Sequence, residues 1–292
     1  MNETLKRAIS GAIYILLLIG STLYSKESFF TLFGVFMLIA VYEFCNLIQI
    51  KKVFPILFGF FLYSSIILVS FYKNESQDFL LKNLNKNYDI SLNINQLNLV
   101  LLSITMVVSI KCILFLFYDK MQTISNSSKY LYLLGYIILP FIFIVKISFG
   151  IKSYNPKIIL GLFILIWTND TFAYLVGKSI GKNKLFERIS PKKTIEGFVG
   201  GIVFAVIASF FISKYYIEGK QLAQYIWIGI ALMVGVFGTT GDLIESKFKR
   251  IAGVKDSGKI MPGHGGVLDR LDSVIFVAPF IFLFYQILYY VS

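Results

Sequence analysis

Long apolar stretches alternate with short polar ones along the whole 292-residue chain. A helix needs about twenty apolar residues to cross the hydrocarbon layer of a membrane. Measured against that length, the pattern predicts an all-α, polytopic integral membrane protein with nine spanning helices. The predicted spans are residues 8–24, 28–50, 53–72, 97–118, 129–149, 157–177, 195–214, 222–241 and 270–290.

Composition supports the membrane prediction. Hydrophobic residues make up 57% of the chain and charged residues 15%, and the mean hydropathy is +0.73, which is too apolar for one soluble core. Lys6 and Arg7 precede the first apolar stretch as in a signal peptide, but no cleavage site of small residues follows, so we predict a retained helix. Cys45 and Cys112 lie far apart inside apolar runs and are interpreted as packing residues.

The net charge of +12 is unevenly distributed among the loops. If the N-terminus is cytoplasmic, the cytoplasmic segments carry eighteen Lys and Arg residues and the opposite side carries eight. The positive-inside rule therefore predicts a cytoplasmic N-terminus and a C-terminus outside. Because no soluble module carries the charge, it indicates cytoplasmic loops and anionic lipid or nucleotide substrates rather than nucleic acid.

The two halves of the chain differ in their polar content. Residues 1–155 hold five predicted spans and little chemistry, and their longest loop, 73–96, is predicted to be a polar spacer outside. Residues 156–292 are predicted to form a catalytic membrane domain of four spans with two charge-rich cytoplasmic loops. Glu43 and Lys111 lie deep in early spans, and pairing with each other, facing a polar cavity and snorkelling all stay open.

Asp170 and Tyr174 share one face of the sixth predicted span. An unneutralised carboxylate inside a membrane is costly, so Asp170 is expected to face the bundle interior or a water-filled cavity. The alternative is a helix-terminal carboxylate at the membrane interface.

The segment Ser190–Thr194 precedes the seventh predicted span. Ser190 is predicted to cap that helix, with Pro191 at its first position. Lys192 and Lys193 would then flank a free helix N-terminus, which is a favourable phosphate site, unless they only anchor the topology. The same helix carries small residues whose spacing predicts close approach of another helix: Gly197, Gly200 and Gly201.

The stretch 241–272 concentrates carboxylates and cations in an otherwise apolar region. Asp242, Glu245 and Ser246 would share one helical face, and Asp269 and Asp272 repeat the three-residue spacing. Hard divalent cations prefer oxygen ligands, and Mg²⁺ is typically held by one or two carboxylates together with substrate phosphates. Two such groups near one cavity therefore predict a site for a Mg²⁺-nucleotide.

Basic residues in the same stretch are suited to bind phosphate oxygens. The alternative is that they only fix the orientation of the chain in the membrane, and we favour that alternative for Lys247. The others are Lys249, Arg250, Lys255 and Arg270. His264 is the only histidine and is flanked by glycines. A phosphate nucleophile is already largely ionised near neutral pH, so His264 is predicted to donate a hydrogen bond rather than to act as general base.

These motifs resemble the phosphatidate cytidylyltransferase family, the CDP-diacylglycerol synthases. The resemblance rests on Ser246-x-x-Lys249-Arg250, Lys255-Asp256, Pro262-Gly263-His264-Gly265-Gly266 and Asp269-Arg270-x-Asp272. A second block runs from Asp170-x-x-Ala173-Tyr174-x-x-Gly177 to Ser190-Pro191-Lys192-Lys193-Thr194-x-Glu196-Gly197. The similarity covers about residues 167–275, whereas the first 150 residues are similar only in hydropathy.

The resemblance implies a nine-span, dimeric enzyme that joins CTP and phosphatidate into CDP-diacylglycerol and pyrophosphate with Mg²⁺, with K⁺ as a candidate second ion. It implies an integral protein of the inner membrane, if the source is bacterial, with its active site facing the cytoplasm. Asp242 and Asp269 would be the principal metal ligands, with Glu245 and Asp272 nearby. The other implied site residues are Ser190, Lys192, Lys193, Thr194, Lys249, Arg250, Lys255 and Arg270 for phosphate, His264 in catalysis, and Asp170, Tyr174 and Ser246 in the cavity.

Three other functions fit parts of the pattern. An enzyme of the same chemistry could use another lipid phosphate, such as an archaeol-type or polyprenyl phosphate. A transporter would show broken helices in both halves, whereas the charge clusters lie only in the second half. A non-catalytic lipid-binding paralogue would have little reason to keep Asp242, Asp269 and the lysine pairs together.

Overall fold

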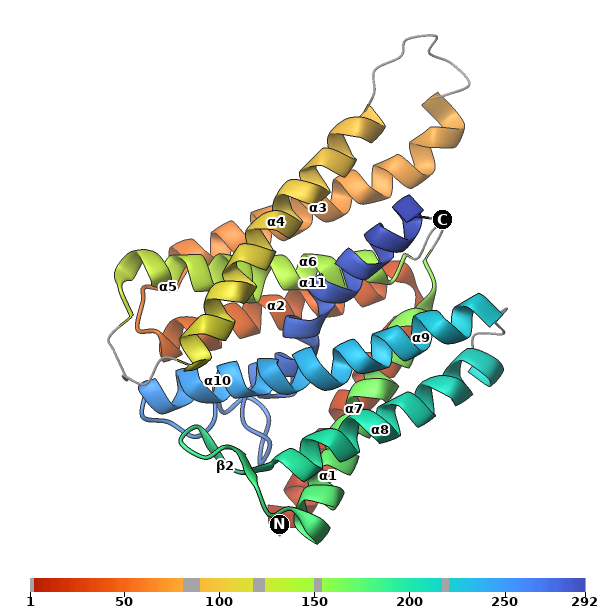
Figure 1. Ribbon diagram of the computed structural model, residues 1–292. Coiled ribbons are helices and arrows are strands. Elements are labelled where there is room, and N and C mark those ends of the chain that lie inside the picture. The colour runs from red at the N-terminus through yellow and green to blue at the C-terminus, as the bar shows by residue number, and fades with distance from the viewer. Residues whose placement is uncertain (1–2, 81–89, 118–123, 150–153, 217–220, 292) are drawn as a thin grey trace.

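The computed structural model describes residues 3–80, 90–117, 124–149, 154–216 and 221–291 as a bundle of long helices (Figure 1). Within these ranges, eight helices are long and apolar enough to cross a membrane, and Val53–Val69 is a shorter apolar helix. Each of the nine predicted spans therefore corresponds to a helix. The prediction of an all-α, polytopic membrane fold is confirmed, and the chain is an integral multi-pass membrane protein.

The first half of the chain forms α1 (Glu3–Tyr24), α2 (Lys26–Leu47), α3 (Val53–Leu80), α4 (Ile90–Phe117), α5 (Asn126–Tyr132) and α6 (Leu139–Ile147). The second half forms α7 (Pro156–Ile180), α8 (Ile195–Phe211), α9 (Gln221–Met233), α10 (Thr239–Ile251) and α11 (Leu268–Val291). Three π-helical segments continue these helices, namely η1 (Leu133–Ile138), η2 (Ile212–Tyr216) and η3 (Val234–Gly238).

One predicted loop is wrong, and one predicted helix is longer than its membrane span. The polar loop expected at 73–96 is largely helical, because α3 continues to Leu80 and α4 begins at Ile90, and residues 81–89 lie outside the described part of the chain. The helix of the eighth predicted span continues past residue 241, as the shared helical face of Asp242, Glu245 and Ser246 requires. Through η3 it continues into α10, so that Ala223–Ile251 is one 29-residue helix whose last part carries the charged residues. That part stays helical because its polar side chains find partners inside the bundle.

The segment before α8 is also different from the prediction. Ser190 does not cap a helix; it begins the strand β2 (Ser190–Thr194), which pairs antiparallel with β1 (Lys184–Phe186). Thr194 is the N-cap of α8 instead, and its hydroxyl accepts the Gly197 N–H at 3.1 Å. Pro191 fits this two-stranded ribbon because an edge strand tolerates a missing N–H donor.

Helices α7 and α8 approach each other very closely, as their small residues predicted. A Cβ atom at Gly197 would lie 2.5 Å from the Ala173 carbonyl oxygen, and one at Gly201 would lie 2.8 Å from the Asn169 carbonyl oxygen. Only glycine allows this contact at either position.

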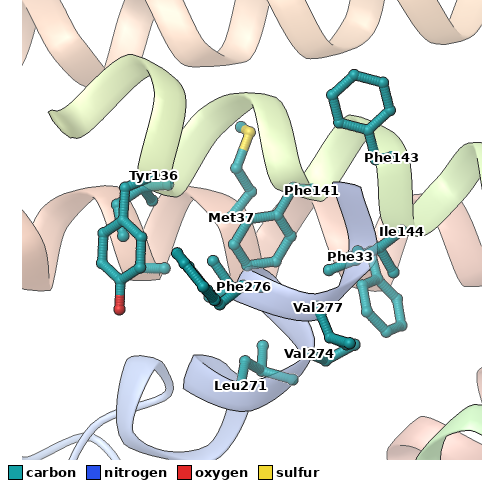
Figure 2. Packing of buried hydrophobic residues seen from close by; sticks show 14 of the residues in the cluster. Phe33, Met37, Tyr136, Phe141, Phe143, Ile144, Leu271, Val274, Phe276 and Val277 are labelled. Carbon is teal, nitrogen blue, oxygen red and sulfur yellow. The ribbon is translucent and has the colours of Figure 1, made fainter. Parts of the chain in front are cut away.

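One hydrophobic core joins both halves of the chain. Figure 2 shows Phe33 and Met37 of α2 packed with α6 residues against Phe276 and Val277 of α11. Phe248 of α10 packs on Phe44 of α2, with ring centroids 5.0 Å apart. The division into regions 1–155 and 156–292 stays a prediction, and the two regions share this core.

The ends of the chain lie at opposite ends of the bundle. In Figure 1 the N-terminus lies near β2 and the loop that precedes α11, while the C-terminus lies at the far end. The two charge-rich segments therefore share one end of the molecule with the N-terminus.

Candidate active site

Carboxylates from α10 and α11 meet where the two helices cross. Oxygen atoms of Asp242, Glu245 and Asp272 lie within 4.8 Å of one another. The crossing is close because α10 presents Gly241 to α11: a Cβ there would lie 2.8 Å from the Asp272 carbonyl oxygen. The two carboxylate pairs predicted from sequence are thus brought together by packing of the helices that carry them.

This acid cluster fits a hard divalent cation. All three side chains offer oxygen ligands, the type that Mg²⁺ prefers. Glu245 is 1% exposed, and its Oε1 atom has no hydrogen-bond partner among the described residues. A buried carboxylate oxygen without a partner is costly, and a cation bound by Asp242, Glu245 and Asp272 would remove that cost.

Lys249 and Asp269 form a buried network beside the cluster. The Lys249 ammonium lies 2.6 Å from Glu245 Oε2 and 2.6 Å from Asp269 Oδ1. Asp269 Oδ2 accepts the N–H and the hydroxyl of Ser257, each at 2.8 Å, and the Gly266 N–H at 2.7 Å. Both residues lie in the site with their polar atoms engaged by protein partners. The metal role of Asp269 and the phosphate role of Lys249 stay predictions.

The β-ribbon reaches the same cluster through Lys193. Its ammonium pairs with Asp242 Oδ2 at 2.5 Å, and Ser246 donates to the other oxygen of that carboxylate at 3.2 Å. The next residue towards the turn, Lys192, is exposed. The ribbon therefore places one lysine in the site and one at its edge.

Three further predicted phosphate residues belong to α10, α11 and the loop between these helices. Arg250, Lys255 and Arg270 are exposed. Arg250 donates to the carbonyl oxygens of Ile189 and Val254, and Arg270 donates to that of His264 at 3.1 Å. The name cationic rim is used below for the four exposed cations Lys192, Arg250, Lys255 and Arg270, of which Arg270 lines the cavity beside the acid cluster. Thr194 is buried as the α8 cap, and Ser190 is half-buried in β2.

The glycine-rich turn before α11 places His264. Gly263 and Gly265 have φ angles of +77° and +87°, which favour glycine. The Ser10 hydroxyl of α1 donates to the Pro262 carbonyl at 2.9 Å and lies 2.8 Å from His264 Nδ1, so we assign the ring proton to Nδ1. Partial burial, then the charges of Arg270 and Arg7, lower the pKa of His264, which favours the neutral ring.

A cavity of about 210 Å³ opens beside the acid cluster, between α1 and α7. Its polar wall includes Asp170, His264 and Asp272, and its apolar wall includes Trp167. The buried Tyr14 hydroxyl in this wall has no partner among the described residues. Asp170 lines this cavity and is exposed. Tyr174 is 65% exposed and is not part of the lining, so the structure does not bring these two residues together in the cavity.

Sequence reasoning missed the contribution of the first two helices. Ser10 and Tyr14 of α1 contact the site or line its cavity, although no motif marks them. Glu43 was noticed only as a charge within a span. It is 1% exposed and accepts the backbone N–H groups of Val267 and Leu268, at 3.2 and 2.9 Å, so it does not snorkel. It also does not pair with Lys111, whose ammonium donates to Ser128 at 2.9 Å.

Fold and site together define a multi-pass membrane protein with a carboxylate cluster at one end of its bundle. Lys193 and Lys249 form ion pairs with carboxylates there, and the exposed cations of the rim belong to the same charge-rich segments. The chain belongs to the cytidylyltransferase family, whose family model matches residues 5–288.

Two similar proteins are named phosphatidate cytidylyltransferase. The one from Staphylococcus aureus (strain COL) is 48% identical over 128 residues, 44% of this chain and 48% of the relative. The one from Bacillus subtilis (strain 168) is 45% identical over 148 residues, 50% of this chain and 54% of the relative. The chain thus matches about half the length of these curated relatives.

Proposed function

We propose that this protein transfers CMP from CTP to phosphatidate, giving CDP-diacylglycerol and pyrophosphate. The observation that carries the proposal is the acid cluster of Asp242, Glu245 and Asp272, with Lys193 paired to it, in a chain of the cytidylyltransferase family. The activity named in its relatives supplies the reaction.

In the proposed reaction, an oxygen of the phosphatidate phosphate attacks the α-phosphorus of CTP. The bond from that phosphorus to the bridging oxygen breaks, and pyrophosphate leaves with the electron pair. The attacking phosphate has a second pKa of about 6, so it is largely ionised at neutral pH and needs no strong base. The main obstacle is to bring two anions together, and catalysis therefore depends on positioning and charge.

The residues of the site match that task. Asp242, Glu245 and Asp272 would hold Mg²⁺, with Asp269 beside them. Bound there, the ion would neutralise the charge that develops on phosphate oxygens. Lys193 can exchange its partner Asp242 for a phosphate oxygen, and Lys192 and Arg270 at the rim can bind the triphosphate. Lys249 keeps Glu245 and Asp269 in place between the two helices.

The proposal extends to location and assembly. The positive-inside rule favours a cytoplasmic active site, where CTP is available, in the inner membrane of a bacterial cell, because the charge-rich segments share one end of the bundle. The cavity between α1 and α7 combines polar and apolar walls, which suits an amphiphilic substrate. A homodimer is proposed from the family resemblance alone.

The test is lipid labelling by the purified protein with CTP labelled at the α-phosphate. Mixed micelles would contain phosphatidate, a polyprenyl phosphate or an archaeol-type phosphate, each with Mg²⁺ or EDTA. We expect metal-dependent labelled CDP-diacylglycerol only with phosphatidate. Labelling of another acceptor alone would replace the proposed substrate. Folded protein that binds CTP but labels no lipid would contradict the transfer reaction.

A further inference from the structure

Glu43 is a buried carboxylate far from the signature motifs in sequence but in contact with them in space. It belongs to α2, whose next residue, Phe44, packs on Phe248 of α10. Its two oxygens accept the N–H groups of Val267 and Leu268, at the point where α11 begins. These bonds span 224 and 225 residues of sequence.

The first N–H groups of a helix have no partner within the helix. Short local side chains usually supply that partner, but at α11 a carboxylate from another helix does so. A negative charge is also favourable there because it faces the positive end of the helix dipole. Glu43 therefore connects the first turn of α11 to a helix held in the core.

The loop that leads into α11 is built around the same carboxylate. The Ser257 hydroxyl lies 3.3 Å from Glu43 Oε2 and 2.8 Å from Asp269 Oδ2, so it joins the two acidic side chains. Gly258 and Gly266 pack directly on Glu43, and a Cβ atom at either position would overlap its oxygens. These glycines leave space for the carboxylate rather than for a ligand.

The contact continues from Glu43 to the acid cluster. Asp269 lies one residue after Leu268, and its ion pair with Lys249 connects it to Glu245. Asp272 lies about one turn further along α11 and contributes directly to the cluster. A shift of the first turn of α11 would therefore displace Asp272 relative to Asp242 and Glu245.

We propose that Glu43 is a positioning residue for the metal site: it anchors the start of α11 and so sets the geometry of Asp269 and Asp272. It does not bind substrate or metal itself. Removal of such outer partners typically costs about 10- to 100-fold in metal affinity or activity. The inference rests on the proposed function only for its kinetic consequences.

The test compares Mn²⁺ binding, measured by electron paramagnetic resonance, in wild-type protein, Glu43→Gln and Glu43→Ala. Glu27→Gln is the matched control, because Glu27 belongs to the same helix and its side chain is 59% exposed. We expect the Kd for Mn²⁺ to rise about tenfold in Glu43→Gln, which keeps one acceptor oxygen, and further in Glu43→Ala. The control should bind Mn²⁺ as the wild type does.

The kinetic measurement uses CDP-diacylglycerol formation. Glu43→Gln should lower kcat and raise the Mg²⁺ concentration for half-maximal rate, with the KM for CTP within about twofold. If Glu43 only stabilised the fold, Glu43→Gln would lower the melting temperature without changing kcat or the Mg²⁺ concentration for half-maximal rate in this way. Unchanged Mn²⁺ affinity in folded Glu43→Gln would overturn the inference.

A milder variant covers the case in which Glu43→Gln does not fold. Ser257→Ala removes only the hydroxyl between the two carboxylates. We expect a roughly two- to threefold loss of Mn²⁺ affinity, which is smaller than the loss expected when Glu43 itself is removed. Wild-type affinity in Ser257→Ala would then overturn the inference. Wild-type protein that binds no Mn²⁺ would overturn the metal assignment and this inference together. Mn²⁺ binding without CDP-diacylglycerol formation would overturn the proposed function alone.

Discussion

The acid cluster and three of the four residues of the cationic rim come from the same stretch of sequence, 241–272, yet the structure holds them in different ways. Glu245 and Lys249 are 1% and 8% exposed and bind each other, whereas the rim residues Lys192 and Arg270 are exposed. A buried and paired side chain has a defined position. An exposed cation on a flexible stem can adapt to a ligand.

This difference separates two expected roles. Groups fixed within a buried network are suited to the transition state, where position decides the rate. Exposed cations are suited to capture of a polyanionic substrate and contribute mainly to binding. Substitutions in the cluster should therefore lower kcat, and substitutions in the rim should raise KM.

The largest effect is expected for Asp242→Asn. The amide keeps the shape but removes the charge that would hold a divalent ion and that pairs with Lys193. We expect CDP-diacylglycerol formation to fall about a thousandfold or more, with an unchanged elution profile in detergent. The control is Glu187→Gln, which makes the same change from carboxylate to amide at an exposed residue in the turn between β1 and β2. Activity of Asp242→Asn near the wild-type level at saturating Mg²⁺ would refute its role as ligand.

A smaller effect is expected for Lys192→Ala at the rim. Loss of one exposed phosphate contact should raise the KM for CTP about tenfold and leave kcat within a factor of about three. The effect should weaken at high salt because exposed charges are screened. Lys259→Ala, at an exposed lysine of the loop between α10 and α11, should leave both constants unchanged. A fall in kcat without a change in KM would remove the distinction between rim and cluster.

Lys247 provides a third comparison, because it lies in the charged helix but points away from the cluster. Its ammonium donates to the carbonyl oxygens of Phe115 and Leu116 at the end of α4 and lies 4.5 Å from the Phe115 ring centroid. Lys247→Met should leave kcat unchanged. It should lower the melting temperature, because the lost hydrogen bonds contribute about 1–3 kcal/mol to the free energy of unfolding. Differential scanning fluorimetry in detergent measures this shift. An unchanged melting temperature would contradict the anchoring role.

The smallest expected effect concerns pH. The pKa of His264 is lowered by partial burial and by the charges of Arg270 and Arg7, so the folded protein binds this proton less well than the unfolded chain. The contribution of His264 to stability is therefore present above the unfolded pKa of about 6.5 and decreases as pH falls towards the folded pKa. Between pH 7.5 and 5.5, roughly the range that spans this pKa, the melting temperature should fall more for wild-type protein than for His264→Gln. Equal falls would contradict this account.

Much of the fold could be predicted from hydropathy because each membrane helix satisfies its own backbone hydrogen bonds. The acid cluster could also be anticipated, since Asp242 and Glu245 share a helical face whatever the tertiary structure. The position of Ser190 in a strand could not, because a two-stranded ribbon depends on pairing with β1 rather than on its own residues. The role of Glu43 depends on a contact across 225 residues, for which one sequence contains no local signal.

The most direct test of the central claim is Mn²⁺ binding to purified wild-type protein and to Asp272→Asn, with Asp256→Asn as an exposed control. Asp272 is decisive because it is the only member of the cluster that α11 contributes. The account predicts stoichiometric binding by the wild type and the control, and a loss of affinity of at least about tenfold in folded Asp272→Asn. Equal Mn²⁺ affinity in Asp272→Asn and the wild type would contradict a metal site formed between α10 and α11.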